Sequence, residues 1–322
     1  MLLLVSALSF GMMRSLPGDP VDVLLGSAQR DMPKEELAGL YKELGLKESP
    51  VKQYWHWLAG WLPSELVGSK AGEALGRSYR DGRAVKEVIG ERLPQTLSLV
   101  GLALFIAFSF GILLGSLLTV LRLSGERYAE LAKALSTTML ALYSMPNFWL
   151  AFLVIALLAQ NPSIYPYPLF GLHEPGEPQT AQTLFIHLII PACLLSYRRA
   201  AKVALFIANL AQEELSAPYV LMDFAKGMGI RQVAGHVVRN CLSPVVNLLG
   251  LSLPALVGGS VLIETIFCVP GLGRLSVEST FARNYPVLMA LTMLYGTIVV
   301  LSSLLADLLV IKLDPRLSEK RQ

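Results

Sequence analysis

The chain has 322 residues, of which 53% are hydrophobic and only 16% are charged, and its mean hydropathy is +0.53. This composition excludes intrinsic disorder and collagen-like repetition, and it indicates a membrane protein whose apolar residues contact lipid. The net charge of +3 is too small to suggest a nucleic-acid partner. The three cysteines, Cys193, Cys241 and Cys268, show no disulfide or zinc spacing.

Apolar stretches between charged residues predict the membrane spans, because a helix needs about 20 apolar residues to cross the hydrocarbon layer. The first stretch, Met1 to Met13, reaches only about 20 Å. We expect residues 1–14 to be the end of a first transmembrane helix whose opening turns precede Met1, with a signal-peptide core as the alternative. Five longer candidates follow, between Arg92 and Arg122, in the first two thirds of Lys133 to Glu174, between Glu177 and Arg198, between Arg239 and Glu264, and between Arg283 and Asp307.

Residues 15–93 carry both charges and are too polar to span, so we expect a small extracytoplasmic cap there. Lys34 to Leu46 has the spacing of an amphipathic helix. The aromatic cluster from Tyr54 to Trp61 favours a helix at the membrane interface, with a ligand-binding aromatic cage as the alternative. The transmembrane domain is expected over 94–312, followed by a tail at 313–322.

The distribution of Lys and Arg predicts the orientation, because cytoplasmic loops are enriched in these residues. Basic residues gather in the 122–133 loop, in the 198–239 segment and in the tail, whereas 161–182 has none. Both termini of this multi-pass membrane protein are therefore expected in the cytoplasm. Glu264 and Asp307 lie at span ends, where placement at the interface is expected and ion or substrate ligation is the alternative.

The chain lacks the motifs of a membrane-embedded enzyme. No H-E-x-x-H zinc motif, G-x-S-x-G nucleophile turn or pair of span-centred aspartates is present. No G-x-x-x-x-G-K-[ST] phosphate loop occurs either, so ATP used in transport would be bound by another chain. We therefore expect neither catalysis nor a bound cofactor or metal.

The segment 213–244 is polar, still helical in pattern, and suited to docking a partner. It resembles the EAA loop of the membrane subunits of binding-protein-dependent ABC importers, and motifs along the whole chain resemble the first permease subunit of dipeptide, oligopeptide and nickel importers. These motifs are LPGDPV (16–21), GRSYRDGRAV (76–85), ERLPQTL (91–97), SMPNFWL (144–150), ETIFCVPGLGRL (264–275), ARNYPV (282–287) and LDPRL (313–317).

This resemblance implies an all-α membrane protein with the six-span bundle of the type I ABC importer permease fold. It also implies four kinds of partner: a second homologous permease, two ATPase subunits that bind ATP and Mg, an extracytoplasmic solute-binding protein, and the lipid bilayer. Peptides are the expected solutes. Nickel complexes, glutathione and oligosaccharides are alternatives, and a membrane enzyme or assembly factor is the rival from another class.

Two groups of residues are candidate sites. The expected ATPase-coupling loop contains Tyr219, Leu221, Met222, Asp223, Phe224, Ala225, Lys226, Gly227, His236, Arg239, Asn240 and Pro244. Its residues 221–224 are more apolar and acidic than the family pattern. Arg198, Arg199 and Lys202 stand earlier than the basic positions of relatives, so either their helix leaves the membrane sooner or these cations face the pathway.

Overall fold

The computed structural model describes residues 2–15, 21, 25, 33–43, 48–59, 75–161, 163–165, 167–172 and 180–313. Within these ranges the regular elements are helices. In addition, one isolated antiparallel bridge pairs Arg77 with Ala84. The chain divides into two compact units, residues 1–96 with 270–297 and residues 97–269 with 298–322. The expectations for Trp61, for the rest of 60–74 and for most of the tail fall outside the described residues.

The first unit contains three short helices from the N-terminal part of the chain, α1 (Leu2–Ser15), α3 (Lys34–Glu43) and α4 (Pro50–Ala59). Helices were expected at α3 and α4, and both are present. α4 packs against α1, where the hydroxyl groups of Tyr54 and Ser6 lie 2.9 Å apart and the Phe10 ring contacts the Tyr54 ring. Part of the aromatic cluster therefore holds α1 instead of forming a cage.

The core of the first unit joins the beginning of α6 (Val85–Leu123), α12 (Leu272–Phe281) and the beginning of α13 (Tyr285–Leu313). α6 thus begins nine residues before the expected transmembrane boundary at residue 94. The buried residues of this core are Val85, Val88, Ile89, Leu272, Leu275, Val287, Ala290 and Leu291. Burying each of these side chains contributes about 1.5–3 kcal/mol, so this apolar cluster holds together segments that are distant in sequence.

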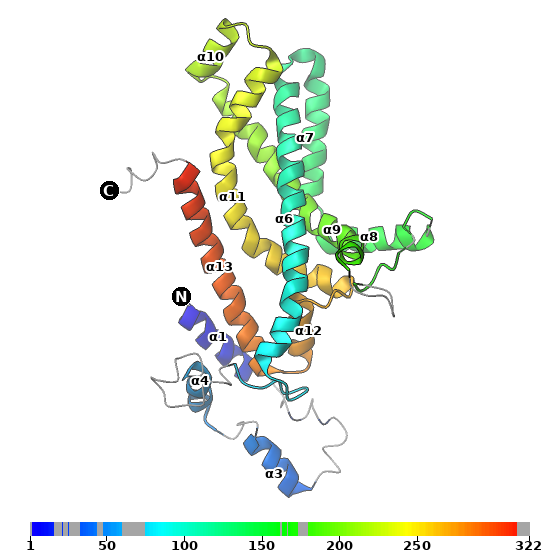
Figure 1. Ribbon diagram of the computed structural model, residues 1–322, viewed down its shortest axis with the longest axis vertical. Coiled ribbons are helices and arrows are strands. Elements are labelled where there is room, and N and C mark those ends of the chain that lie inside the picture. The colour runs from blue at the N-terminus through cyan, green and yellow to red at the C-terminus, as the bar shows by residue number, and fades with distance from the viewer. Residues whose placement is uncertain are drawn as a thin grey trace, which may run out of the picture. The chain divides into compact units, whose positions relative to one another are not determined.

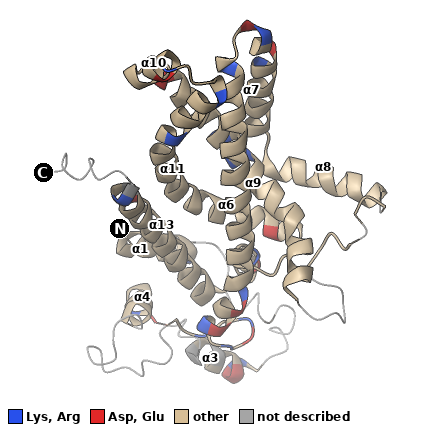
Figure 2. Ribbon diagram, turned by 45° about the horizontal axis from the view of Figure 1, so that its top comes forward, with Lys and Arg blue, Asp and Glu red and all other residues tan. Residues whose placement is uncertain are grey.

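The second unit contains the remainder of α6 and α13 and six further helices, η2 to α11 in chain order (Figure 1). These are η2 (Glu126–Tyr128), α7 (Ala129–Ser144), α8 (Asn147–Gln160), α9 (Ala181–Glu214), α10 (Pro218–Ala225) and α11 (Ile230–Ile266). α9 packs against α7, α8 and α11. In Figure 2, α8 is free of charged residues, whereas charges gather near α10 and the beginning of α7.

Among the described residues, four helices are long and apolar enough to cross a membrane, α6, α9, α11 and α13. A fifth span results if α7 and α8 are counted together, and α1 is an apolar helix of only 14 residues. The span expected after Lys133 is divided into α7 and α8, which meet at an angle of 99°. Pro146 explains the break, since proline disfavours a helical conformation in the preceding residue, and Met145 is extended (φ −72°, ψ 136°).

α6 and α9 approach each other more closely than side chains would allow. A Cβ atom added at Gly111 would lie 2.6 Å from Val203 Cβ, and one at Gly115 would lie 2.8 Å from Ile207 Cβ. The two contacts advance by four residues on both helices, so α6 and α9 run in the same direction. Gly250 of α11 allows a similar approach to Ala306 of α13.

Candidate functional site

The expected coupling loop forms a compact helical tip on the second unit. α10 follows α9 after a short turn, and α11 begins four residues after α10 ends, so the later part of 213–244 belongs to a long helix. The tip has an apolar core of Ala211, Val220, Val233, Val237 and Cys241. Its residues are therefore held by packing against α9 and α11, and they are not an unstructured loop.

Polar contacts fix the inner face of α10. Asp223 is buried, and its Oδ2 lies 2.9 Å from His236 Nδ1 on α11. The Tyr219 hydroxyl donates to Glu214 Oε2 at 2.8 Å and has Asn240 as a second side-chain partner. Burial raises the pKa of Tyr219, so the phenol remains a donor at neutral pH. The structure thus brings together four of the sequence-predicted residues.

The outer face of α10 is apolar and exposed. Leu221, Met222 and Phe224 have exposed fractions of 62%, 57% and 42%. Ala225, Lys226 and Gly227 are exposed at the end of the helix, and Arg239, Asn240 and Pro244 are exposed on α11. Residues 221–224 therefore lie on two faces of α10. Asp223 points into the protein, and its apolar neighbours point away from it.

Gly227 has a backbone reason to be glycine. Its φ is +76°, and among the described residues beyond its chain neighbours no atom lies within 4 Å of an added Cβ. Gly227 N–H donates to Phe224 O, and Met228 N–H donates to Asp223 O, which is the hydrogen-bond pattern of a Schellman helix end. The glycine is required by this turn whether or not a partner packs on it.

The three candidate pathway cations lie in the middle of α9, which continues to Glu214. The helix therefore continues well beyond these cations, and both expectations for them, an early exit from the membrane and a position facing the pathway, stay predictions. The offset set by Gly111 and Val203 places Arg199 level with Ala107 of α6, halfway along the charge-free run between Arg92 and Arg122. At about 1.5 Å per residue, Arg199 is roughly 20 Å from either end of that run.

Side chains of α9 donate hydrogen bonds to backbone carbonyls that the break between α7 and α8 leaves without a helical partner. Arg198 Nε donates to the Tyr143 carbonyl at 3.0 Å, and the Tyr197 hydroxyl donates to the Met145 carbonyl at 2.8 Å. A helix end has carbonyls without intrahelical partners and a partial negative charge, so a guanidinium is well suited to cap it. Within the described part of the chain, no carboxylate forms an ion pair with Arg198, Arg199 or Lys202.

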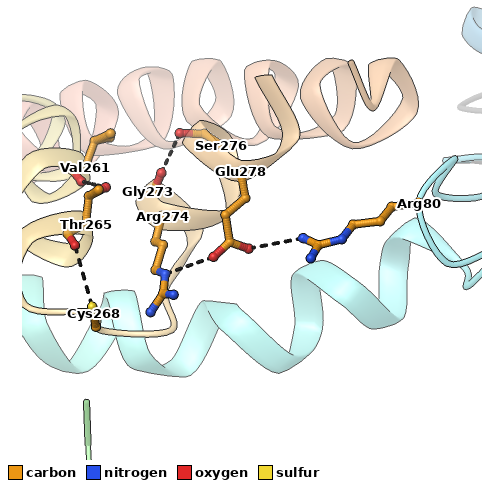
Figure 3. A network of polar contacts seen from close by, with 8 residues as sticks. All are labelled: Arg80, Val261, Thr265, Cys268, Gly273, Arg274, Ser276 and Glu278. Carbon is orange, nitrogen blue, oxygen red and sulfur yellow. Dashed lines mark hydrogen bonds and ion pairs between the residues drawn. The ribbon is translucent and has the colours of Figure 1, made fainter. Parts of the chain in front are cut away.

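The first unit has a separate polar network, in which Glu278 bridges two arginines (Figure 3). Its Oε1 accepts from Arg274 Nε at 2.8 Å, and its Oε2 lies 3.7 Å from Arg80 Nη1. Nearby, Asn284 Nδ2 donates to Ser78 Oγ at 2.9 Å, and Asn284 Oδ1 accepts from Tyr79 N–H at 3.0 Å. The motifs GRSYRDGRAV and ARNYPV, about 200 residues apart, therefore meet in one structure.

Sequence reasoning missed several of these residues. Tyr197 gave no signal, because its role depends on the break between two other helices, α7 and α8. Gly111 and Gly115 form a G-x-x-x-G pattern that is visible in the sequence and typical of close helix contacts. Glu264, near the end of α11, is fully buried and accepts from Ser260 Oγ at 2.9 Å, which the sequence did not indicate, whereas Asp307 is exposed.

Two family profiles together match almost the whole chain. Residues 111–319 match the "Binding-protein-dependent transport system inner membrane component" family, and residues 1–100 match the family of its N-terminal part. The oligopeptide transport system permease protein AppB of Bacillus subtilis (strain 168) is 33% identical over 328 residues, which cover 98% of this chain and 95% of AppB. The dipeptide transport system permease protein DppB of Escherichia coli (strain K12) is 31% identical over 337 residues, with the same coverage.

A solved structure shares the fold. A chain of the MetNI methionine ABC transporter in an inward-facing conformation aligns with a TM-score of 0.56 and 21% identity, over 70% of this chain and 95% of that chain. The helical architecture, the apolar spans and the full-length sequence similarity all agree with a membrane-spanning permease. The chain belongs to the inner-membrane permease components of binding-protein-dependent ABC importers, which transport solutes and are not enzymes.

Proposed function

We propose that this chain forms half of the translocation pathway of an ABC importer for peptides. The observation that carries the proposal is whole-chain similarity, at 31–33% identity, to permeases named for oligopeptide and dipeptide transport. The similarity covers 98% of the chain, so it includes the helices that would line a pathway as well as the coupling tip.

The proposed topology has six spans, with both termini in the cytoplasm and residues 15–93 forming an extracytoplasmic cap. The spans are α1, α6, the bent pair α7 and α8, α9, α11 and α13. The common direction of α6 and α9 supports this count, because the chain between two helices that cross in the same direction must return once. The bent pair then serves as one span.

The proposed partners are a second homologous permease, two ATPase subunits that bind ATP and Mg, and an extracytoplasmic solute-binding protein. The exposed outer face of α10 supports docking of an ATPase, since apolar side chains left in water are unfavourable. Burial of Leu221, Met222 and Phe224 would contribute about 1.5–3 kcal/mol each. An exposed ion pair of Lys226 would add at most about 1 kcal/mol, so packing should dominate.

The proposed pathway includes Arg198, Arg199 and Lys202. A cation that faces lipid near mid-membrane costs several kcal/mol, whereas one that faces water or a polar cavity costs far less. Their half-buried positions and the absence of a described carboxylate partner support an aqueous or ligand-facing environment. Lipid-facing anchors would lie nearer the ends of the charge-free run.

Reconstitution tests the proposed function. The chain is assembled with its partner permease, ATPases and binding protein in proteoliposomes, and uptake of radiolabelled dipeptides is measured. We expect uptake that requires both ATP on the ATPase side and the binding protein on the other side. Uptake of a nickel complex or an oligosaccharide in place of peptides, with the same ligand retained by the purified binding protein, would contradict peptide transport.

Cysteine labelling tests the topology. A cysteine at Gln182, just inside the beginning of α9, should react with an impermeant reagent added outside intact cells. One at Glu126, between α6 and α7, should react only after permeabilisation. The reverse pattern would overturn the proposed orientation.

A further inference from the structure

A cavity of about 140 Å³ lies where the α7–α8 break faces α9 and α11. Tyr143 and Asn147 line it from the two sides of the break, Arg198 and Arg199 from α9, and Ala255 and Gly259 from α11. By the α6–α9 offset, it lies near the middle of the charge-free run. Lipid headgroups are therefore too far away to supply its ligand.

The charge in this cavity is not balanced by the residues that the structure describes. Arg198 uses Nε to cap Tyr143 O, which fixes its guanidinium beside the Tyr143 ring at 5.6 Å from the ring centroid. Arg199, the next residue on α9, has no carboxylate within 4.0 Å among the described residues. Two adjacent guanidiniums in a low-dielectric cavity repel each other, so an anion bound between them would be strongly favoured.

Asn147 sets a second requirement for the ligand of this cavity. It occupies the first turn of α8, and its Oδ1 is enclosed without a hydrogen-bond partner. A buried amide oxygen left unpaired costs about 1–3 kcal/mol, so rotation of the Asn147 amide into the cavity, where Oδ1 could accept from a ligand N–H, would relieve that cost. A carboxylate with a neighbouring amide N–H has both features, and these groups occur together at the C-terminal residue of a peptide.

We propose that this cavity binds the terminal carboxylate of the transported peptide, with Arg199 as the ligand for the carboxylate and Asn147 as the acceptor for the adjacent N–H. The inference rests on the proposed function and specifies the chemistry of one subsite in the pathway. Arg198 is a positioning residue, since its hydrogen bond to Tyr143 O holds the wall of the cavity in place.

The electrostatic test uses the assembled importer in membrane vesicles and a reporter cysteine at Ala255, which is exposed and lines the cavity. Its modification rates are compared for a sulfonate-bearing and a trimethylammonium-bearing methanethiosulfonate, after subtraction of the rates of the parent protein. We expect the anionic reagent to react faster. Arg199→Gln should reduce this preference about tenfold, which is a change of about 1.4 kcal/mol in the difference between the two reagents, because their opposite charges respond to the lost cation in opposite directions.

Two matched variants make the result specific. Arg199→Lys keeps the charge and should preserve the preference, whereas Lys133→Gln removes a charge from α7, outside the cavity lining and the proposed pathway, and should change the preference less than threefold. An unchanged preference in Arg199→Gln would overturn the anion site. This outcome does not depend on which solute the importer carries, so it is distinguishable from failure of peptide uptake.

A protection experiment identifies the anion. Ala-Ala should slow modification of the reporter cysteine during turnover, and Ala-Ala amide, which lacks the carboxylate, should not. Protection by Ala-Ala should be lost in Arg199→Gln and retained in Arg199→Lys. Equal protection by both peptides, or protection by neither, would overturn the carboxylate assignment even if dipeptide uptake were observed.

Discussion

Arg198 of α9 caps the broken end of α7 by donating from Nε to the Tyr143 carbonyl at 3.0 Å. In an unbroken helix, that carbonyl would accept from the N–H of residue 147. The neighbouring Tyr197 hydroxyl compensates Met145 O in the same way. The sharp bend at Pro146 therefore leaves neither carbonyl without a donor.

The first prediction concerns this cap. Arg198→Gln should destabilise the importer by about 1.5–3 kcal/mol, because a hydrogen bond from a charged donor to the α7 end is lost. Tyr197→Phe should cost less, about 0.5–1.5 kcal/mol, since its donor is neutral. Thermal unfolding of the purified complex measures both. Equal stability of Arg198→Gln and the parent protein would show that the cap is dispensable.

The second prediction concerns two glycines of α6. Gly111→Ala should destabilise the protein by about 1–3 kcal/mol, because its Cβ would lie 2.6 Å from Val203 Cβ. Gly101→Ala is the matched control, since no atom lies within 4 Å of its Cβ. It should stabilise the helix by about 0.5–1 kcal/mol. Thermal unfolding and membrane abundance report the sign, and the same sign for both variants would contradict the close contact.

The third prediction concerns the outer face of α10. Replacing Leu221, Met222 and Phe224 by serine should reduce co-purification of the ATPase at least tenfold, because the apolar area available to the partner is lost. Lys226→Ala should have a much smaller effect. Gly227→Trp should also uncouple the ATPase, although strain at φ +76° contributes to its effect. Full retention of the ATPase by the triple variant would place the coupling surface elsewhere.

The fourth prediction uses Tyr79 as a local reporter. Burial raises the pKa of its phenol to about 12. Asn284→Ala removes the acceptor for Tyr79 N–H and the donor to Ser78, so local opening should shift the pKa down towards 10. Ser78→Ala should shift it less. Phenolate absorbance against pH, corrected with Tyr79→Phe, measures the shift; a pKa unchanged by Asn284→Ala would mean that this contact does not hold the loop.

The stability that this phenol contributes has a definite pH dependence. The pKa in the folded protein is higher than that of an unfolded tyrosine, so the contribution is fully present below pH 10 and is lost as the pH rises towards 12. Tyr79→Phe should remove this alkaline component of unfolding.

Much of the helical content could be predicted, because long apolar runs without charge leave few alternatives in a membrane. α6, α11 and α13 correspond to such runs, and α10 corresponds to the helical pattern in the polar loop. The bend between α7 and α8 was less accessible. Proline can kink a helix, as Pro146 does here, but the 99° angle also depends on donors from α9 that lie over 50 residues away.

The positions of the charged residues were the hardest to predict. Arg198 and Arg199 resembled the end of a span, because spans were predicted as uncharged runs and each run ends at its next charged residue. The register of α9 against α6, which depends on Gly111 and Gly115, places Arg199 level with the middle of the charge-free run of α6. Glu264 lies near the end of α11, as the sequence indicated, but its full burial beside Ser260 had no signal in the sequence.

The contact between those glycines and α9 also limits how the second unit could rearrange. Val203 and Ile207 each sit directly over a glycine, so sliding one helix along the other by even half a turn would drive a β-branched side chain into backbone. Axial translation of α6 against α9 is therefore blocked by steric clash. Pivoting about the shared contact is the relative motion of the two helices that avoids this clash. Any change of access in the second unit should then carry these two helices as one rigid body.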